Sequence, residues 1–258
     1  MSPVPDIPAA EHETLARPPL KTMLGQVRFP TILRIADLGV LGSFQQAIQQ
    51  AWPEFDNEQQ WSVVLGPQGL QQAGAARAFR FTAADRMWST VLTTDSITVE
   101  AALEDGGYTS YEDFKERFLG LWSAVLEYFK PVAVLQQGLR YVNHIERDLP
   151  PADWADLINP ELLGSIGATL SSGLVQAMCD LRFKREDGML AFKHGLVPAG
   201  PENRPGYLLD FDCFSQQRSE DTSAEALVAR FERDHASIYS FFRWCLTERA
   251  LREFRDGA

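Results

Sequence analysis

Two stretches of the sequence decide the fold: RFTAADRM at residues 80–87 and RFKREDGM at residues 182–189. They share an Arg-Phe pair, an Asp and a Met at a constant offset of 102 residues. In each stretch a β-prone run precedes a short polar turn and a second β-prone run follows it, which is typical of a β-hairpin. The sequence therefore predicts the same hairpin twice.

Each predicted hairpin continues into a third β-prone run and then a long amphipathic helix. The first group comprises runs at 78–82, 88–93 and 97–101, with a helix at 110–129. The second comprises runs at 175–184, 189–196 and 207–214, with a helix at 223–244. Six positions of the two helices correspond at an offset of 113: Phe114, Arg117, Phe118, Trp122, Val125 and Phe129 with Leu227, Arg230, Phe231, His235, Ile238 and Phe242.

The matches between the two helices are weak evidence for a duplication, because any two amphipathic helices share a period. The matches between the two hairpins do not follow from that period, and they favour a duplicated β-β-β-α unit. Thr109 with Glu112, and Thr222 with Glu225, also stand at capping-box spacing where the helices begin. The predicted fold class is α+β, with one antiparallel sheet or two joined sheets and the long helices packed on one face.

The chain divides into three parts on composition and pattern. Residues 1–19 contain five prolines and predict a flexible lead-in. Residues 20–147 form the first α+β unit. This unit begins with a strand at 23–29 and a short helix at 43–52, which come before its three-strand group. Residues 148–258 form the second unit, and a single continuous domain remains an alternative.

Charge limits the classes of partner. The 258 residues include 24 Lys and Arg against 35 Asp and Glu, a formal charge of −11. Such a chain repels phosphate backbones, and its basic residues are scattered, so direct nucleic-acid binding is not expected. An acidic surface suits a basic partner protein.

The three cysteines, Cys179, Cys213 and Cys245, lie far apart in apolar stretches. This spacing predicts a reducing compartment rather than a disulfide framework. The N-terminus shows no signal-peptide pattern, and no apolar stretch is long enough to cross a bilayer. We expect a cytoplasmic protein without membrane association, whose oligomeric state stays open.

Familiar catalytic and cofactor motifs do not occur. The sequence lacks a phosphate-binding loop, a dinucleotide fingerprint, a zinc-protease helix, a nucleophile elbow and paired CxxC motifs. No catalytic residue, cofactor or metal is therefore assigned. Enzymatic activity stays open, and the missing motifs favour a non-enzymatic role.

Two isolated features have structural explanations. His235 lies in an apolar helical stripe at the position that Trp122 holds in the first helix, which favours a packing role over catalysis. Asp210 and Asp212 alternate along a strand and share one face, where they could bind a cation. The solvent face of an amphipathic strand is the favoured interpretation.

The strand expected at 132–145 is the most unusual segment. On it Leu139, Tyr141 and Asn143 share one face, while Arg140, Val142 and His144 share the other. Arg140 and His144 could hold an anionic group. The candidate ligand- or partner-binding residues are Arg28, Arg140, Tyr141, Asn143 and His144. The alternative is an edge strand with a solvated Arg and a structural Asn.

Several stretches resemble a family of bacterial proteins of similar length, found sporadically across distant lineages and without an assigned activity. The resemblance rests on Pro18-Pro19-Leu20, on 26–30 (QVRFP), on Phe44-Gln45, Trp52-Pro53, Arg80-Phe81, Trp88, Tyr111 and Phe114, and most distinctively on 138–145 (GLRYVNHI). It covers most of the chain to about residue 147 and is looser beyond. The resemblance implies a bacterial source and an accessory role such as defence, toxin neutralisation or specialised biosynthesis.

These observations lead to one expected function and one alternative. We expect a non-enzymatic interaction protein, a subunit or antitoxin-like partner in a bacterial accessory or defence system, with a protein partner that is basic. The alternative is a small-molecule-binding or enzymatic domain. In that case an anion-accepting pocket would lie between the two units, lined by Arg28, Arg140, Tyr141 and His144.

Overall fold

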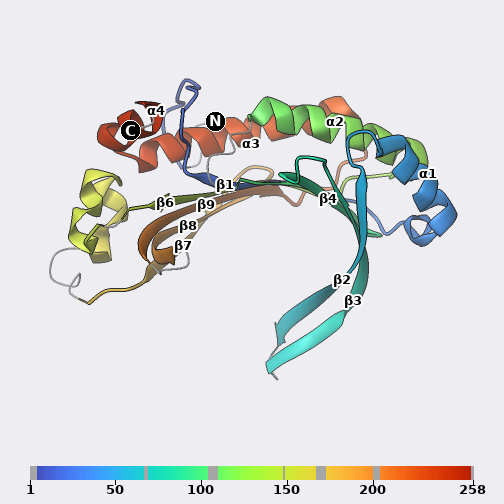
Figure 1. Ribbon diagram of the computed structural model, residues 1–258, viewed down its shortest axis with the longest axis horizontal. Coiled ribbons are helices and arrows are strands. Elements are labelled where there is room, and N and C mark those ends of the chain that lie inside the picture. The colour runs from blue at the N-terminus through green and yellow to red at the C-terminus, as the bar shows by residue number, and fades with distance from the viewer. Residues whose placement is uncertain are drawn as a thin grey trace.

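The computed structural model describes residues 5–66, 69–103, 110–147, 149–166, 173–199 and 204–256. Within these ranges the chain is a mixed α+β protein with a nine-stranded antiparallel sheet and four α-helices (Figure 1). None of these helices is long and apolar enough to span a bilayer. The cytoplasmic location stays a prediction.

One sheet contains every strand. The strands are β1 Leu20–Arg28, β2 Glu54–Gly66, β3 Gly69–Thr82, β4 Trp88–Leu92, β5 Ser96–Ala102, β6 Gln136–Glu146, β7 Ala177–Lys184, β8 Gly188–Ala199 and β9 Arg204–Ser215. Their order across the sheet is β2-β3-β4-β5-β1-β6-β9-β8-β7. The central pair is β1 with β6, in a register that sets Leu24 opposite Arg140. The β2–β3 hairpin extends beyond the other strands (Figure 1).

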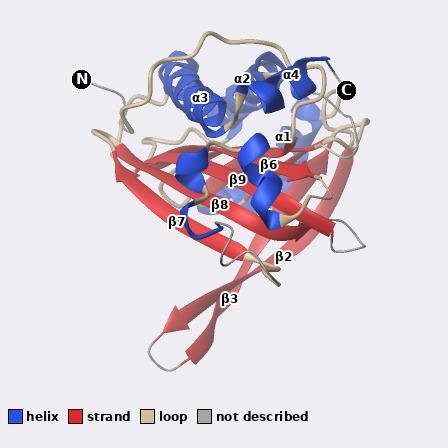
Figure 2. Ribbon diagram, turned by 90° about the vertical axis from the view of Figure 1, so that its left-hand side faces the viewer, coloured by secondary structure: helices blue, strands red, loops and turns tan. Residues whose placement is uncertain are grey.

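The four helices are α1 Leu38–Ile48, α2 Tyr111–Tyr128, α3 Ala224–Cys245 and α4 Glu248–Asp256. Figures 1 and 2 show α2 and α3 on the same side of the sheet. The two helices meet at Phe118 and Phe231, whose ring centroids are 4.8 Å apart. Helix α3 also contacts β6, where the Gln137 side chain donates a 2.7 Å hydrogen bond to the carbonyl of Leu227.

Helix α2 lies very close to the sheet. A Cβ atom added to Gly25 of β1 would come within 2.2 Å of the Phe114 ring. Glycine at this position therefore permits an approach that no larger residue allows. Buried aromatic side chains of α2 and α3 belong to the hydrophobic core that covers this face of the sheet.

The helix caps differ by one residue from the prediction. Ser110 caps α2 and forms a capping box with Asp113, and Ser223 caps α3 by accepting from the Ala226 N–H. Thr222 is thus not the cap, and the predicted Thr109 lies outside the described residues. Before α2 a Ser-x-x-Asp spacing directly follows the Thr-x-x-Glu spacing, so the sequence offered two adjacent capping boxes there. Ser223 is followed three residues later by Ala226 and caps α3 without a box.

Other boundaries also moved. Helix α1 begins at Leu38 rather than Ser43, because the Asp37 side chain accepts from the N–H groups of Gly39 and Val40. Strand β6 begins at Gln136 rather than Val132. Short 3₁₀ turns at Pro151–Asp156, Pro160–Leu162 and Gly164–Ile166 lie between β6 and β7. Helix α4 was not predicted.

Candidate functional site

Strand β6 continues past the start of β1 and so leaves a gap in the sheet. Leu20 is the first residue of β1 and pairs with Asn143, and the His144 N–H still donates to the Pro19 carbonyl at 2.8 Å. Pro18 and Pro19 have no N–H to donate, which ends the ladder. Because backbone groups alternate sides along a strand, Glu146 also turns its backbone towards the gap.

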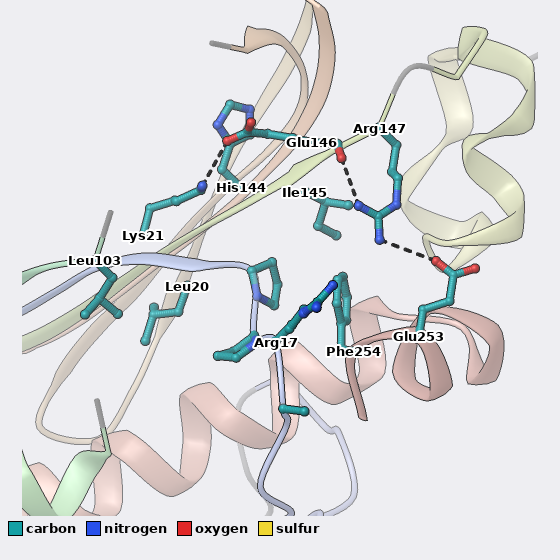
Figure 3. Close-up of a pocket in the computed structure, with 13 residues that line it drawn as sticks. Arg17, Leu20, Lys21, Leu103, His144, Ile145, Glu146, Arg147, Glu253 and Phe254 are labelled. Atoms are coloured by element: carbon teal, nitrogen blue, oxygen red, sulfur yellow. Dashed lines mark hydrogen bonds and ion pairs between the residues drawn. The ribbon is translucent and has the colours of Figure 1, made fainter. Parts of the chain in front are cut away.

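A pocket of about 510 Å³ occupies this gap, and we call it the terminal pocket (Figure 3). Its walls come from the N-terminal segment, the start of β1, the end of β6 and helix α4. Apolar walls are supplied by Pro18, Pro19, Leu20, Leu103, Ile145 and Phe254; the polar lining consists of Arg17, Lys21, His144, Glu146, Arg147 and Glu253.

Most charges of the terminal pocket are paired. Lys21 lies 3.0 Å from the Glu146 carboxylate, and Arg147 lies 3.6 Å from that of Glu253. Within the described residues, no carboxylate lies at ion-pairing distance from Arg17, although its backbone N–H donates to the Phe254 carbonyl at 3.0 Å. Glu253 also pairs with Arg249 at 3.2 Å. Among the cations that line the pocket, Arg17 is the one for which the described residues supply no ion pair.

His144 adds an unsatisfied polar atom to the same pocket. The pKa of His144 is lowered, mainly because the ring is buried. The charge of Glu146 raises this pKa, and the charge of Lys21 lowers it, by smaller amounts. The ring is therefore neutral at pH 7. Its Nε2 atom is buried and has no hydrogen-bond partner in the described protein. Such an atom costs about 1–3 kcal/mol unless it is satisfied.

A second, smaller cavity of about 80 Å³ lies between β6 and α3, and we call it the aromatic cavity. It shares Pro18 and Leu20 with the terminal pocket. Six of its lining residues carry aromatic or imidazole rings: His12, Tyr111, Tyr141, His235, Tyr239 and Phe242. The two sites are therefore separated only by the chain that enters β1.

His235 organises the aromatic cavity. Its Nδ1 lies 2.8 Å from the Tyr141 hydroxyl, and the Tyr111 ring stacks on it at 4.2 Å and 5°. Burial, with a smaller effect of His12, lowers the pKa of His235 to about 4, so the ring is neutral at pH 7. Burial also raises the pKa of Tyr111, whose hydroxyl has no hydrogen-bond partner among the described residues.

Residues 10–15 form the outer wall of the aromatic cavity. The Ala10 N–H donates to Ser240 Oγ at 3.1 Å, and the Glu13 N–H donates to the Tyr239 hydroxyl at 2.8 Å. The Glu13 carboxylate pairs with Arg243 at 2.6 Å and also with Arg255. The flexibility expected for residues 1–19 stays a prediction, because contacts do not measure motion.

The five candidate residues do not meet in one site. Tyr141 and Asn143 line the aromatic cavity, and His144 lines the terminal pocket. Arg140 points to the other face of the sheet, where it forms two hydrogen bonds to Asp210 at 2.8 and 2.7 Å. Arg28 lies at the other end of β1 from Leu20, which lines both cavities. At 3.3 Å per residue the two positions are about 26 Å apart.

Arg28 and Arg140 are therefore already occupied. Arg28 pairs with Asp95 at 2.7 Å, as Arg140 does with Asp210. The single pocket expected from Arg28, Arg140, Tyr141 and His144 is thus not formed, because the alternation of β6 sends Arg140 and Tyr141 to opposite faces.

The two aspartates of β9 do not form part of a larger acidic group. Asp210 is engaged by Arg140, and burial is the main cause that raises the pKa of Asp212. Within the described ranges, no three His, Cys, Asp or Glu side chains lie close enough together to hold a metal ion.

Sequence reasoning missed the charged residues that line the terminal pocket together with His144. Arg17 lies in the Pro-rich lead-in, and Glu253 lies in the helix that was not predicted. The available signal was Pro18-Pro19, which must end strand pairing and so expose the neighbouring strand.

Comparisons with known proteins add little. No protein-family model matches the chain, and no curated protein matches it. Among solved structures, the crystal structure of the di-domain aromatase/cyclase StfQ from the steffimycin biosynthetic pathway matches 92% of this chain and 99% of its own. The sequence identity is 11% and the TM-score 0.19, values at which the match supports no conclusion on fold or function.

Proposed function

We propose that this protein binds a small organic anion in the terminal pocket. The supporting observation is the guanidinium of Arg17, which has no ion-pairing carboxylate among the described residues, in a pocket of about 510 Å³. Across the pocket lies His144, whose buried Nε2 has no hydrogen-bond partner in the described part of the chain (Figure 3). That volume falls within the range of about 300–1,000 Å³ that is usual for small-molecule sites.

The charges of the pocket favour a singly charged ligand. Lys21 pairs with Glu146, and Arg147 pairs with Glu253, which Arg249 also contacts. Among the described residues that line the pocket, the cations exceed the carboxylates by one. A planar carboxylate matches the fork of an arginine better than a spherical ion does. The apolar side chains of Leu20, Ile145 and Phe254 suit a short hydrocarbon tail. The ligand class is therefore an aliphatic or aromatic monocarboxylate.

Calorimetric titration with butyrate, hexanoate and octanoate tests this proposal. We expect the affinity to rise with chain length, and Arg17→Ala to weaken octanoate binding about tenfold or more, since a hydrogen bond to a charged group contributes about 1.5–3 kcal/mol. Arg28→Ala is the matched control, because Arg28 is exposed and ion-paired at the far end of β1. Equal affinities of wild type and Arg17→Ala, or no binding at all, would contradict the proposal.

A second candidate function is the non-enzymatic interaction protein with a basic partner. The face of the sheet opposite α2 and α3 supports it, since Arg140, Asp210, Asp212 and Lys193 gather there on β6, β9 and β8. A formal charge of −11 favours a basic partner. A role as subunit or antitoxin-like partner in a bacterial accessory or defence system is compatible with this face.

Affinity purification of the tagged chain from its native host tests the second candidate. A specific partner should be retained by wild type and lost with Asp212→Lys, which reverses a charge on the open face. A partner that is retained equally by both forms, or the absence of any, would argue against it.

We also propose that the two β-β-β-α groups, β3-β4-β5-α2 and β7-β8-β9-α3, are two copies of one unit. The strand order supports this, because β5-β4-β3 follows β1 outward as β9-β8-β7 follows β6. Two ion pairs at the aligned positions support it as well: Arg117 with Asp85 at 3.3 Å and Arg230 with Asp187 at 3.2 Å. Each ties a long helix to the turn of a hairpin.

An experimental structure tests the duplication. Helix α2 with β3, β4 and β5 should superpose strand for strand on α3 with β7, β8 and β9. A different strand order in either half would contradict it.

A further inference from the structure

Strand β7 ends the sheet, and among the described residues no strand pairs with its outer edge. Its inner edge pairs with β8, in an uninterrupted register from Ala177 with Leu196 to Lys184 with Met189. Half of the backbone N–H and C=O groups of such a strand face away from the sheet and can pair with another strand. The strand contains no proline and no bulge in its register, two features that commonly protect an edge.

The side chains of β7 are exposed on both faces of the sheet. Met178 and Asp180 lie on the open face, where Met178 is 42% exposed. Cys179 and Leu181 lie on the helix face, since they alternate in step with Phe183, which contacts Phe241 of α3. Leu181 is nevertheless 36% exposed, so α3 does not cover the outer part of this face. An exposed, partly apolar edge of this kind is a template for strand addition.

We propose that two copies of this chain associate through antiparallel pairing of their β7 strands, which joins the two sheets into one. A twofold axis perpendicular to the sheet pairs each residue with one on the same face. With the axis at Leu181, Asp180 lies opposite the partner's Arg182, and Arg182 lies opposite the partner's Asp180. Within one strand the same two side chains lie 3.6 Å apart as an exposed ion pair. In this register each of them gains a second opposite charge, so the strand is complementary in charge to itself.

The charges select this register over its neighbours. Moving the axis to residue 180 sets Asp180 opposite the partner's Asp180, and moving it to residue 182 sets Arg182 opposite the partner's Arg182. Like charges directly opposite each other destabilise a strand pair, whereas opposite charges contribute about 0.2–1 kcal/mol. The register centred on residue 182 also sets Asp180 opposite the partner's Lys184, but it brings the two Arg182 side chains together. The register centred on Leu181 pairs opposite charges without a like-charge pair.

The helix face of the joined strands is apolar in the same register. Leu181 meets the partner's Leu181, and Cys179 meets the partner's Phe183. The exposed hydrophobic side chains are thus covered at the same time as the charges are paired. An interface of one strand pair is small, and complexes below about 1,200 Å² are weak or transient. We expect a dissociation constant of about 1–100 µM, independent of any ligand in the terminal pocket.

Sedimentation equilibrium tests the proposal over loading concentrations from about 5 to about 500 µM. Wild type should dimerise reversibly. Asp180→Arg and Arg182→Asp should each weaken the dimer about tenfold, and the double variant, which restores both pairs, should recover it. Circular dichroism checks that each variant is folded. A wild type that stays monomeric at the highest concentration, or single variants that dimerise as well as wild type, would overturn the proposal.

A crosslink tests the register itself. Cα atoms of directly opposed residues in an antiparallel pair are about 4.5–5.5 Å apart, within the reach of a disulfide. Leu181→Cys in a Cys179→Ser background should therefore form a disulfide-linked dimer under mild oxidation. The wild-type chain is the control, because Cys179 is exposed but lies opposite Phe183 in this register. Crosslinking of wild type equal to that of the Leu181→Cys variant would exclude the register.

Discussion

Trp122 on α2 and His235 on α3 each stand twelve residues after the serine that caps their helix, yet their surroundings differ. Trp122 is fully buried, stacks on Phe118 at 6.0 Å and 10°, and donates from its indole N–H to the Thr222 carbonyl at 2.9 Å. His235 borders the aromatic cavity and has the Tyr141 hydroxyl 2.8 Å from its Nδ1.

The strand beneath each ring accounts for the difference. On β1 and just after it, Val27 and Phe29 are apolar and fully buried. On β6, Tyr141 and Asn143 carry polar groups into the equivalent layer, and Asn143 donates to the Leu209 carbonyl at 3.2 Å. The layer around Trp122, between α2 and β1, is thus filled with apolar side chains. The layer around His235, between α3 and β6, retains a cavity beside polar groups, and a binding site is expected there.

The largest effect on stability should come from removing the Trp122 side chain from the closely packed layer between α2 and β1. Trp122→Ala should lower the free energy of unfolding by about 3–5 kcal/mol, because it leaves a large cavity in a closely packed core. His235→Ala should cost only about 1–2 kcal/mol, since that ring already borders a cavity and loses mainly a hydrogen bond. Urea unfolding of both variants makes the comparison. Equal losses would show that the two positions do not differ.

The close approach of α2 to the sheet should be nearly as sensitive. Gly25→Ala should lower the free energy of unfolding by about 1–3 kcal/mol, because the new methyl overlaps the Phe114 ring. Gly42→Ala on α1 is the control, where no atom lies within 4 Å of the added carbon and a small stabilisation is expected. A Gly25→Ala protein as stable as wild type would mean that α2 is not seated on β1.

The pH dependence of stability should reveal the protonation of His235, which has no counterpart at Trp122. The pKa of His235 is lowered from 6.5 to about 4 by folding, so its stabilisation is complete at neutral pH and is lost as the pH falls from 6.5 towards 4. The loss should reach about 1.4 kcal/mol at pH 5.5. His144 and His194 shift in the same direction, so the measurement is the difference between wild type and His235→Phe. Parallel pH profiles of the two proteins would contradict the assignment.

The sequence anticipated the sheet better than the site. The strands around Trp88 and Phe192 follow clear alternation with polar turns, and the two long helices have strong apolar stripes, so local pattern sufficed. The terminal pocket joins Arg17 to Glu253, at opposite ends of the chain. No local pattern encodes such a contact. Sequence reasoning did select the end of β6, because Tyr141, Asn143 and His144 all border a cavity there.

The smallest effect should be local, at the wall of the aromatic cavity. Glu13→Gln removes the charge that pairs with Arg243 and Arg255. Amides of residues 10–15 should then exchange with deuterium faster, while those of α3 remain protected. Glu11→Gln, at an exposed position of the same segment, is the matched control. Unchanged exchange after Glu13→Gln would mean that these ion pairs do not hold the segment in place.

The central claim, that the terminal pocket binds an organic monoanion, is tested most directly at His144. Proton–nitrogen NMR can follow the titration of the four histidines with and without saturating octanoate. A carboxylate beside His144 favours its protonated form, so its pKa should rise on binding while that of His194, which is buried next to Tyr207, stays unchanged. An unchanged His144 pKa in the presence of octanoate would contradict the claim.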